Sequence, residues 1–385
     1  MKIHVFINCY WGTGISGGDR RILELLRRWK DCSDYSFVIY TTNNFYKLMK
    51  KEQILSFQVV LVDHGKRSGN IVLEYLRRTR ACIKELKRNA EPGDIFYSPT
   101  DILPDILPAA YMKKKNKNAY RWCMITFHIF ELFYKRPGNM IVNFLSCYQQ
   151  KYADYIGKRR ADAILTTSPI VYDFFMKKGY DTNKLIMTDN AVDIGIIDHS
   201  NLPEQGYDAC FLARLNYSKG IMELPIIWKH VLEKNPNARL AIMGKGSEEI
   251  VNELKAKIRE ENVEDKIDLL GYVEADRAYS LMKNSKLFLF TSHEEGWGMA
   301  LAEALVCSIP VVAYDLPIYR ILFQKGVNLC PLKDCRDMAK KVCYLLQHEE
   351  ERMNQGREGR EYILSHYSLD VVAKKELQVL LGTKA

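Results

Sequence analysis

The chain has 385 residues, of which 47% are hydrophobic, and a formal net charge of +9 at pH 7. This length exceeds the roughly 250–300 residues at which a single hydrophobic core stops growing, so we expect two domains. The apolar content excludes a disordered chain, and no uncharged apolar stretch reaches the ~18–20 residues that a membrane-spanning helix needs. Residues 3–11 lack a following small-residue cleavage site, so we interpret them as a buried strand and not as a signal peptide.

The positive charge is unevenly distributed along the chain. Residues 1–195 contain 31 basic and 19 acidic residues, a net charge of +12, whereas residues 196–385 contain 25 and 28, a net charge of −3. This asymmetry indicates an anionic partner for the first half, and the alternative is a solvated basic face without a partner.

The ten cysteines are scattered, and none forms a C-x-x-C pair. Several lie inside apolar runs, which is typical of thiols in a reducing compartment and not of a disulfide framework or a zinc site. We therefore expect a cytoplasmic protein.

Apolar runs of strand length alternate with amphipathic stretches of helix length. In the first half the predicted strands are 3–9, 36–40, 59–62, 95–97, 122–127 and 163–166. In the second half they are 209–213, 239–243, 267–270, 287–290, 310–313 and 327–330. Continuously apolar strands belong to sheets that are buried on both faces, so the pattern predicts an α/β fold with a parallel sheet in each half.

A polar, turn-rich segment separates the two halves and predicts a linker at residues 198–207. The predicted domains are then 1–197 at the N-terminus and 208–366 at the C-terminus. A last amphipathic helix within 367–385 can pack back on the N-terminal domain.

The first candidate motif runs from Gly12 to Gly17 and formally matches G-x-G-x-x-G between a strand and a helix. A dinucleotide site also needs an acidic residue at the end of the next strand, but that strand runs into Thr41 and Thr42, which argues against an NAD oxidoreductase. A glycine turn at a helix N-terminus remains, with Gly17 and Gly18 as its working residues, because the helix amides favour an anion. The alternative is a tight turn without a ligand.

Two further segments follow predicted strands of the second half. Arg214 and Lys219 lie five residues apart after strand 209–213, where two cations suit a diphosphate, although alone they are also typical of plain surface. Glu295 and Glu303 lie eight residues apart, a little over two helical turns. The amides of residues 298–300 are expected at the N-terminus of the helix that begins between the two glutamates. The alternative is that both glutamates lie on a solvated helix face.

Together these segments resemble glycosyltransferase family 4, the large retaining family with the GT-B architecture. The matching segments occur in order at 16–18, 126–128, 161–168, 190–193, 213–220, 243–246, 271–273, 295–303 and 310–313. The resemblance implies two Rossmann-like domains with an inter-domain cleft. The chain departs from the family at Ala191, Ala213 and Ser308, where glycine is usual, and none of these changes removes a catalytic group.

The resemblance also implies residue roles. Arg214 and Lys219 would hold the diphosphate of a nucleoside diphosphate sugar, Glu295 would contact the sugar and Glu303 the ribose. The amides of Gly18, Gly298, Met299 and Ala300 would complete the donor site. His128 and Glu295 would be catalytic, and Gly17 and His128 would face the acceptor. For His128 the alternative is a core histidine. The chain contains no D-x-D, so we expect no metal and no cofactor beyond the donor.

Aromatic residues beside lysines at 111–117 and 130–136 suit a membrane surface, so we expect peripheral contact with an anionic membrane on its cytoplasmic face. The alternative for these segments is a solvated loop. No recognised nucleic-acid module occurs. The resemblance to glycosyltransferase family 4 thus implies a retaining hexosyltransferase that acts on a glycan or lipid-linked acceptor in cell-envelope polysaccharide synthesis. The alternatives are a non-catalytic protein that binds anionic lipid or nucleic acid, and a sugar-nucleotide epimerase.

Overall fold

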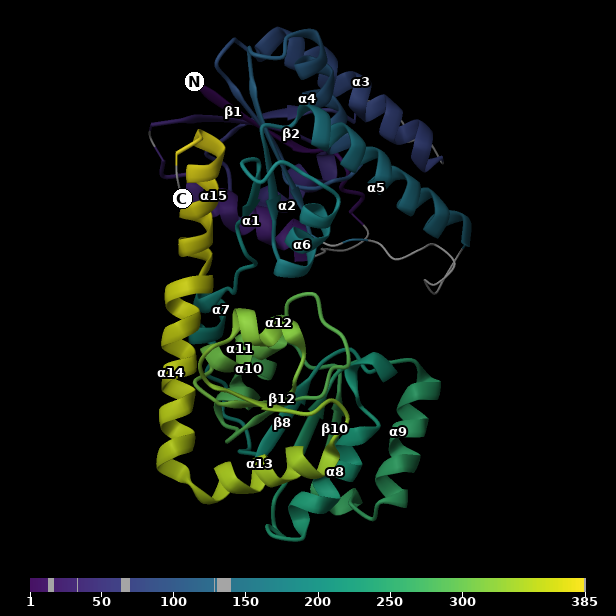
Figure 1. Ribbon diagram of the computed structural model, residues 1–385, viewed down its shortest axis with the longest axis vertical. Helices are drawn as coiled ribbons and strands as arrows, with labels where there is room; N and C mark the ends of the chain where they lie inside the picture. Colours follow the sequence, from purple (N-terminus) through teal and green to yellow (C-terminus); the bar gives the residue numbers. More distant parts are fainter. Residues whose placement is uncertain (13–16, 33, 64–69, 128, 130–139, 384–385) are drawn as a thin grey trace. The chain divides into compact units, whose positions relative to one another are not determined.

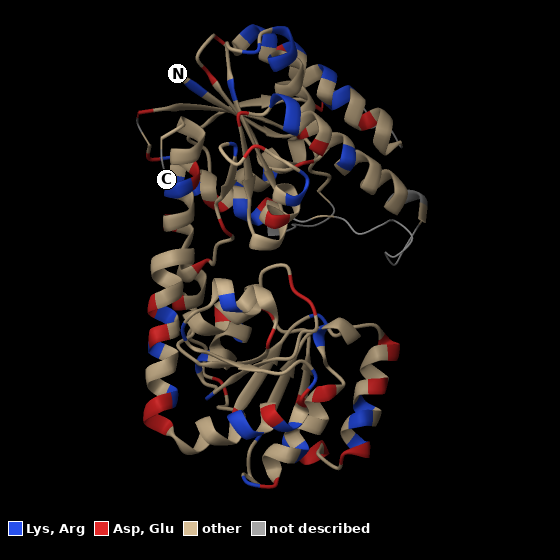
Figure 2. Cartoon of the chain, viewed as in Figure 1, with Lys and Arg blue, Asp and Glu red and all other residues tan. Residues whose placement is uncertain are grey.

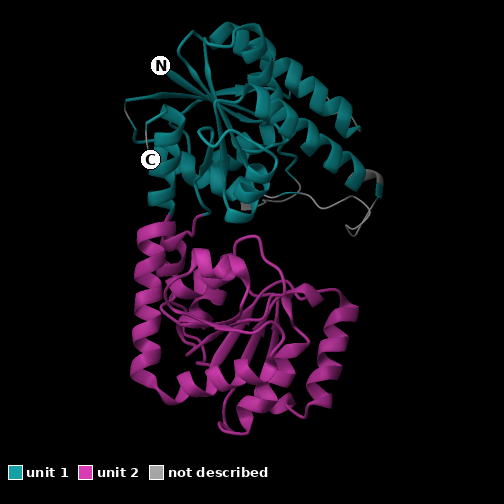
Figure 3. Ribbon diagram, in the orientation of Figure 1, with its two compact units in different colours: residues 1–190, 369–385 teal, residues 191–368 magenta. Residues whose placement is uncertain are grey.

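The computed structural model (Figure 1) describes residues 1–12, 17–32, 34–63, 70–127, 129 and 140–383. The chain divides into two compact units. The first contains residues 1–190 and 369–385, and the second contains residues 191–368 (Figure 3). Both units are built on a parallel sheet, as the apolar runs predict.

The first unit contains a seven-stranded sheet in the order β3-β2-β1-β4-β5-β6-β7, with all pairs parallel. Its strands are β1 (Lys2–Ile7), β2 (Ser36–Thr41), β3 (Gln58–Leu61), β4 (Ile95–Ser98), β5 (Arg121–Thr126), β6 (Ala163–Thr166) and β7 (Leu185–Met187). The six predicted strands of this half are confirmed. Strand β7 is not predicted by the apolar runs, because it has only three residues and lies at the sheet edge.

Helices cover both faces of this sheet, and two separate clusters of buried side chains fill the space between the layers. One face carries α1 (Gly17–Trp29), α2 (Asn43–Lys51) and α15 (Leu369–Leu381). The other face carries α3 (Ile71–Asn89), α4 (Leu103–Lys115), α5 (Met140–Arg160) and α6 (Pro169–Lys177). Lys and Arg are frequent on α3 and α4 (Figure 2).

The C-terminal helix α15 packs against the first unit. Arg21 of α1 forms a buried ion pair with Glu376 of α15, and the Trp29 indole donates to the Ala373 carbonyl at 3.0 Å. Since α14 (Glu349–Tyr367) belongs to the second unit, the chain returns to the first unit at Ser368.

The predicted linker at 198–207 does not connect the units, because the boundary lies between Asn190 and Ala191. The segment belongs to the second unit, where Ile197 and Tyr207 on either side of it are buried in the core. The Leu202 amide donates to the Ser280 hydroxyl at 2.9 Å. Its polar, turn-rich composition therefore marks a loop that is bonded to the second unit. Beside it lies a short helix, α7 (Ile194–His199).

The second unit contains a six-stranded parallel sheet in the order β10-β9-β8-β11-β12-β13. The strands are β8 (Ala209–Leu212), β9 (Leu240–Met243), β10 (Ile267–Gly271), β11 (Phe288–Phe290), β12 (Val311–Tyr314) and β13 (Val327–Cys330), and all six predicted strands are confirmed. One face carries α7, α10 (Ala275–Lys283), α11 (Met299–Val306), α12 (Pro317–Leu322) and α14. The other carries α8 (Glu223–Leu232), α9 (Glu248–Glu260) and α13 (Cys335–Gln347). Within the described ranges, no helix is both long enough and apolar enough to cross a membrane.

Candidate active site

The strand order of the second sheet reverses at β8. The next strand in sequence, β9, lies on one side of β8, whereas β11 lies on its other side. In open α/β sheets, ligands bind outside the carboxyl ends of the strands at such a switch point, because the loops diverge there and leave a crevice. The loops after β8 and β11 carry Lys219 and Glu295, so the topology brings two predicted site segments together.

The loop after β11 donates hydrogen bonds to backbone carbonyls of the loop after β8. The Thr291 hydroxyl donates to the Lys219 carbonyl at 2.8 Å, and the His293 amide donates to the Ser218 carbonyl at 2.8 Å. Gly220 follows Lys219 and has a φ of +64°. A Cβ on Gly220 would lie 2.1 Å from the Thr291 carbonyl oxygen. Only glycine fits this close approach, which sets the position of Lys219.

Lys219 and Glu295 form an ion pair at the end of the sheet, with the Lys219 ammonium donating to the Glu295 carboxylate. The Ser292 hydroxyl donates to the same carboxylate oxygen at 2.9 Å. Both side chains of the ion pair are partly exposed, at 18% for Lys219 and 15% for Glu295. A ligand in solvent can therefore reach the cation and the carboxylate together.

Arg214, the other predicted phosphate-binding cation, projects from the same loop and is exposed. Within the described part of the chain no hydrogen bond or ion pair engages its guanidinium. The structure thus places Arg214 and Lys219 on one loop but neutralises only Lys219.

The second glutamate, Glu303, does not lie on a solvated helix face. It stands in the second turn of α11 and is partly buried, and its carboxylate accepts a hydrogen bond from the Tyr279 hydroxyl at 3.2 Å. Burial raises the pKa of Glu303 to about 7, and the Tyr279 hydrogen bond opposes that rise. At neutral pH this carboxyl is therefore balanced between its acidic and ionised forms.

The turn between the two glutamates ends at Gly298, which caps α11 with a φ of +103°. A Cβ on Gly298 would lie 3.3 Å from the Tyr319 ring, so the turn is also sterically tight. Met299 and Ala300 open the helix and retain some exposure. Their amides are among the first of α11, which lack intrahelical acceptors and favour an anion.

Three residues of this site were missed by the sequence analysis: Ser292, Tyr279 and Tyr319. Ser292 lies three residues before Glu295 in the sequence, so its proximity was a usable signal. Tyr279 lies inside α10, where nothing in the pattern distinguishes it. The Tyr319 hydroxyl is buried without a hydrogen-bond partner within the described chain. Burial, and then the charge of Glu295, raise the pKa of Tyr319.

In the first unit, Gly17 and Gly18 open α1 beyond the carboxyl end of β1. Residues 13–16 and the predicted catalytic His128 lie outside the described residues. Nothing described therefore bears on whether His128 faces an acceptor.

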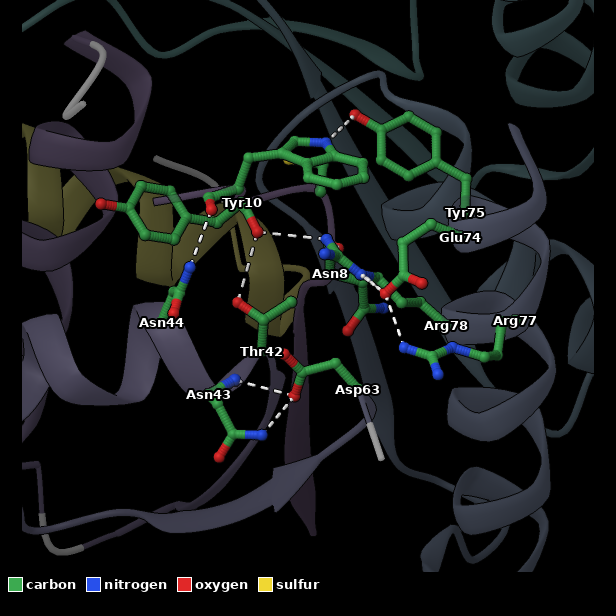
Figure 4. A network of polar contacts seen from close by, with 12 residues as sticks. Asn8, Tyr10, Thr42, Asn43, Asn44, Asp63, Glu74, Tyr75, Arg77 and Arg78 are labelled. Carbon is green, nitrogen blue, oxygen red and sulfur yellow. Dashed lines mark hydrogen bonds and ion pairs between the residues drawn. The ribbon is translucent and has the colours of Figure 1, made fainter. Parts of the chain in front are cut away.

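The loop that leads from β1 toward these glycines is held by buried polar side chains, which the sequence analysis also missed (Figure 4). The Arg78 guanidinium donates to the Asn8 and Tyr10 carbonyls at 2.9 and 3.1 Å. The Asn44 amide group donates to the Trp11 carbonyl at 2.7 Å. On the other side of the loop the Asn8 amide donates to Asp105, whose pKa burial raises to about 7. Residues Asn8, Tyr10 and Trp11 of this loop are therefore bonded to neighbouring elements of the first unit.

Within the described ranges, no group of three or more His, Cys, Asp and Glu residues is placed to hold a metal ion. Metal independence of the chemistry stays a prediction, because it rests on the missing D-x-D sequence.

Comparison with known proteins finds a family similarity within the second unit. Residues 195–362 match the sequence model for "Glycosyl transferases group 1". A poly(ribitol-phosphate) alpha-N-acetylglucosaminyltransferase of Staphylococcus aureus is 28% identical over 171 residues, 44% of this chain and 34% of that protein. A GDP-mannose:cellobiosyl-diphosphopolyprenol alpha-mannosyltransferase of Xanthomonas oryzae is 24% identical over 195 residues, 50% of this chain and 51% of that protein. The matches thus span between a third and about a half of these two relatives.

The whole chain also resembles a solved structure. The crystal structure of Anabaena Alr3699/HepE in complex with UDP superposes with a TM-score of 0.75 over 99% of this chain and 100% of that one, at 15% identity. At this identity the likeness shows the fold alone. Together with the two parallel sheets, it assigns the chain the GT-B fold.

Proposed function

Since residues 195–362 of the second unit match the sequence model for group 1 glycosyl transferases, we propose that the protein is a retaining, metal-independent glycosyltransferase. It transfers a hexose-type sugar from a nucleoside diphosphate sugar to a glycan or lipid-linked acceptor in the synthesis of cell-envelope polysaccharide.

The observation that carries this proposal is the contact between Lys219 and Glu295 at the switch point of the second sheet. A diphosphate that binds Lys219 competes for its ammonium and frees the Glu295 carboxylate. That carboxylate can then accept hydrogen bonds from the hydroxyls of the sugar attached to the same diphosphate. The pair therefore suits a ligand that carries phosphate and sugar together.

The neighbouring groups supply the rest of a donor site. Arg214 is an exposed cation on the same loop, and the amides of Gly298, Met299 and Ala300 lie at the start of α11. Positive groups of this kind stabilise the charge that develops on a departing nucleoside diphosphate. Glu303, once ionised, accepts hydrogen bonds from ribose hydroxyls.

The relatives support the acceptor and the stereochemistry. One is named for a poly(ribitol-phosphate) acceptor and the other for a diphosphopolyprenol acceptor, and both are named as alpha-transferases. Acceptors of this kind are anionic, which suits the net charge of +12 on residues 1–195. We assign acceptor contacts to Gly17 and His128, and we assign the Gly18 amide to the donor site.

A thermal-shift screen of the full chain with UDP-, GDP-, ADP- and dTDP-sugars tests the proposal. A ligand at a hundredfold excess over its Kd stabilises by ~2.7 kcal/mol, which is readily measured. We expect one of these sugar nucleotides to stabilise the protein. We also expect the nucleoside diphosphate to be released from that sugar nucleotide quickly only after an acceptor is added. Conversion of the sugar without any acceptor would instead indicate an epimerase. A chain that binds no sugar nucleotide would refute the proposal.

A further inference from the structure

The outer face of α5 exposes apolar and aromatic side chains. Met140 is 65% exposed, Leu145 47% and Tyr148 54%. The remaining exposed apolar side chains on this helix are Phe144, Tyr152 and Tyr155. Most of this set recurs at spacings of three and four residues, so it forms one stripe along the helix.

Helix α3 repeats the arrangement. Its first turns expose Ile71, Val72, Leu73 and Leu76, between 43% and 58% each. An N-terminal turn with four exposed aliphatic side chains is costly in water, because roughly 25 cal/mol is lost per Å² of apolar surface left unburied.

The two apolar ends lie on the same side of the first unit. Helix α3 follows β3 and α5 follows β5, and in a parallel sheet the helix after a strand begins at the carboxyl edge of the sheet. Both helices flank α4 on one face of the sheet, and Figure 1 shows their beginnings extending past the sheet on the same side. Helix α5 has 21 residues and is therefore ~31 Å long. Because it is longer than the strands that it covers, its first turns extend past the edge of the sheet.

Exposed cations lie beyond the first turns of both helices. The exposed charged residues of α5 are Lys151, Lys158 and Arg159, and those of α3 are Arg80, Lys84, Lys87 and Arg88. None of the exposed, described side chains of either helix is acidic, because Glu74 and Asp154 are buried and Glu85 is partly buried and paired with Arg88. In Figure 2 the beginning of α5 carries no charge and its Lys and Arg lie further along.

Segment 111–117, which we expect to face a membrane, exposes Lys114, Lys115 and Lys117 but not Lys113. Lys113 of segment 111–117 is buried, and its ammonium pairs with Asp162 at 2.7 Å, so it cannot face lipid. Segment 130–136 lies outside the described residues.

We propose that the exposed faces of α3 and α5 form a docking surface for an anionic lipid bilayer. The aliphatic beginnings of the two helices enter the interfacial region. Tyr148, Tyr152 and Tyr155 lie at the level of the headgroups, where amphipathic rings are favoured, and the following cations meet anionic headgroups. The bilayer then lies beside the carboxyl edge of the first sheet. A lipid-linked substrate would reach that edge without leaving the membrane surface.

Co-sedimentation of the full chain with vesicles tests this surface without any nucleotide sugar, so its outcome is separate from that of the transfer reaction. We expect binding to vesicles that contain phosphatidylglycerol, much weaker binding to phosphatidylcholine alone, and loss of binding in high salt. The double variant Phe144→Ser with Leu145→Ser should bind roughly tenfold more weakly. Lys151→Gln should bind about fivefold more weakly.

Matched controls lie in the second unit. Met353→Ser removes an apolar side chain that is 65% exposed on α14, and Lys255→Gln removes an exposed cation on α9. Both should bind vesicles as the wild type does, and all variants should unfold at the wild-type temperature because the side chains are exposed. The inference is wrong if the anionic vesicles bind no protein, or if the α5 variants bind like their controls. It is also wrong if the chain is a dimer that Phe144→Ser dissociates, since the surface would then join two copies.

Discussion

Lys219 and Glu295 are separated by 76 residues in the sequence, and their side chains form an ion pair at the ends of two neighbouring strands. The pair holds the cation proposed for the diphosphate against the carboxylate proposed for the sugar. Donor binding must therefore separate the Lys219 ammonium from the Glu295 carboxylate. The role of each group can be tested by replacing one residue and keeping the other.

Replacing Lys219 should weaken the binding of the diphosphate. A hydrogen bond to a charged group contributes ~1.5–3 kcal/mol, so Lys219→Met should raise the Kd of the nucleoside diphosphate found in the screen by roughly 10- to 150-fold. Isothermal titration calorimetry measures this value. Lys255→Met, on the exposed face of α9, is the matched control. An unchanged Kd for Lys219→Met would remove this residue from the donor site.

Replacing Glu295 should separate sugar recognition from diphosphate binding. Glu295→Gln keeps the size of the side chain and removes the charge that neutralises Lys219. It should lower kcat/KM at least about a hundredfold, as expected for a lost contact at the reacting sugar. It should also bind the sugar-free nucleoside diphosphate as tightly as the wild type or more tightly. Turnover close to that of the wild type would contradict the role of Glu295.

The close approach of the β8 and β11 loops depends on Gly220. Gly220 and Gly271 have similar φ angles, +64° and +67°, but a Cβ would meet the Thr291 carbonyl only at Gly220. Gly271→Ala should cost about 1 kcal/mol for the left-handed backbone, whereas Gly220→Ala adds the overlap and should cost at least ~2 kcal/mol more. Urea denaturation of both variants measures the difference. Equal costs would show that the two loops can move apart.

The raised pKa of Glu303 predicts opposite pH trends for donor binding and stability. Its folded pKa of about 7 exceeds the ordinary value of 4.5. Nucleotide affinity should rise from pH 6 to 8, because only the ionised carboxyl accepts two ribose hydroxyls. The unliganded protein should lose stability as the pH rises from ~4.5 to ~7, because the folded state binds the proton more tightly than the unfolded state does.

Glu303→Gln should make both the nucleotide affinity and the stability of the protein less dependent on pH. Calorimetric Kd values and thermal unfolding at a series of pH values check them. A wild-type affinity that does not depend on pH in this range would exclude Glu303 as the ribose acceptor.

Two ion pairs join α15 to α1, and they differ in burial. Glu376 is fully buried against Arg21, whereas Asp370 is 81% exposed beside Arg28. Glu376→Gln should cost ~3–5 kcal/mol, because it leaves the Arg21 charge buried and uncompensated. Asp370→Asn should cost less than about 1 kcal/mol.

Urea denaturation ranks the two variants, and hydrogen exchange of the α15 amides shows whether the helix is released. If Asp370→Asn proved the more costly change, the packing of α15 would depend on its surface and not on its buried pair.

The amino-acid sequence by itself determined the secondary structure and the class of fold. Strands such as β8 and β11 are continuously apolar over a few residues, and that pattern is local, so it can be read without knowing what lies beside it. The motif of two glutamates eight residues apart was likewise readable, because both lie on one short stretch of loop and helix.

The tertiary structure alone decided which of these residues meet. The pairing of Lys219 with Glu295 depends on β11 lying beside β8, and the ion pair of Glu376 depends on the chain returning to the first unit after α14. The pKa of Glu303 and the exposure of Leu145 depend on which neighbours cover each side chain. Contacts and burial of this kind join residues far apart in the sequence, and no local pattern of residue types encodes them.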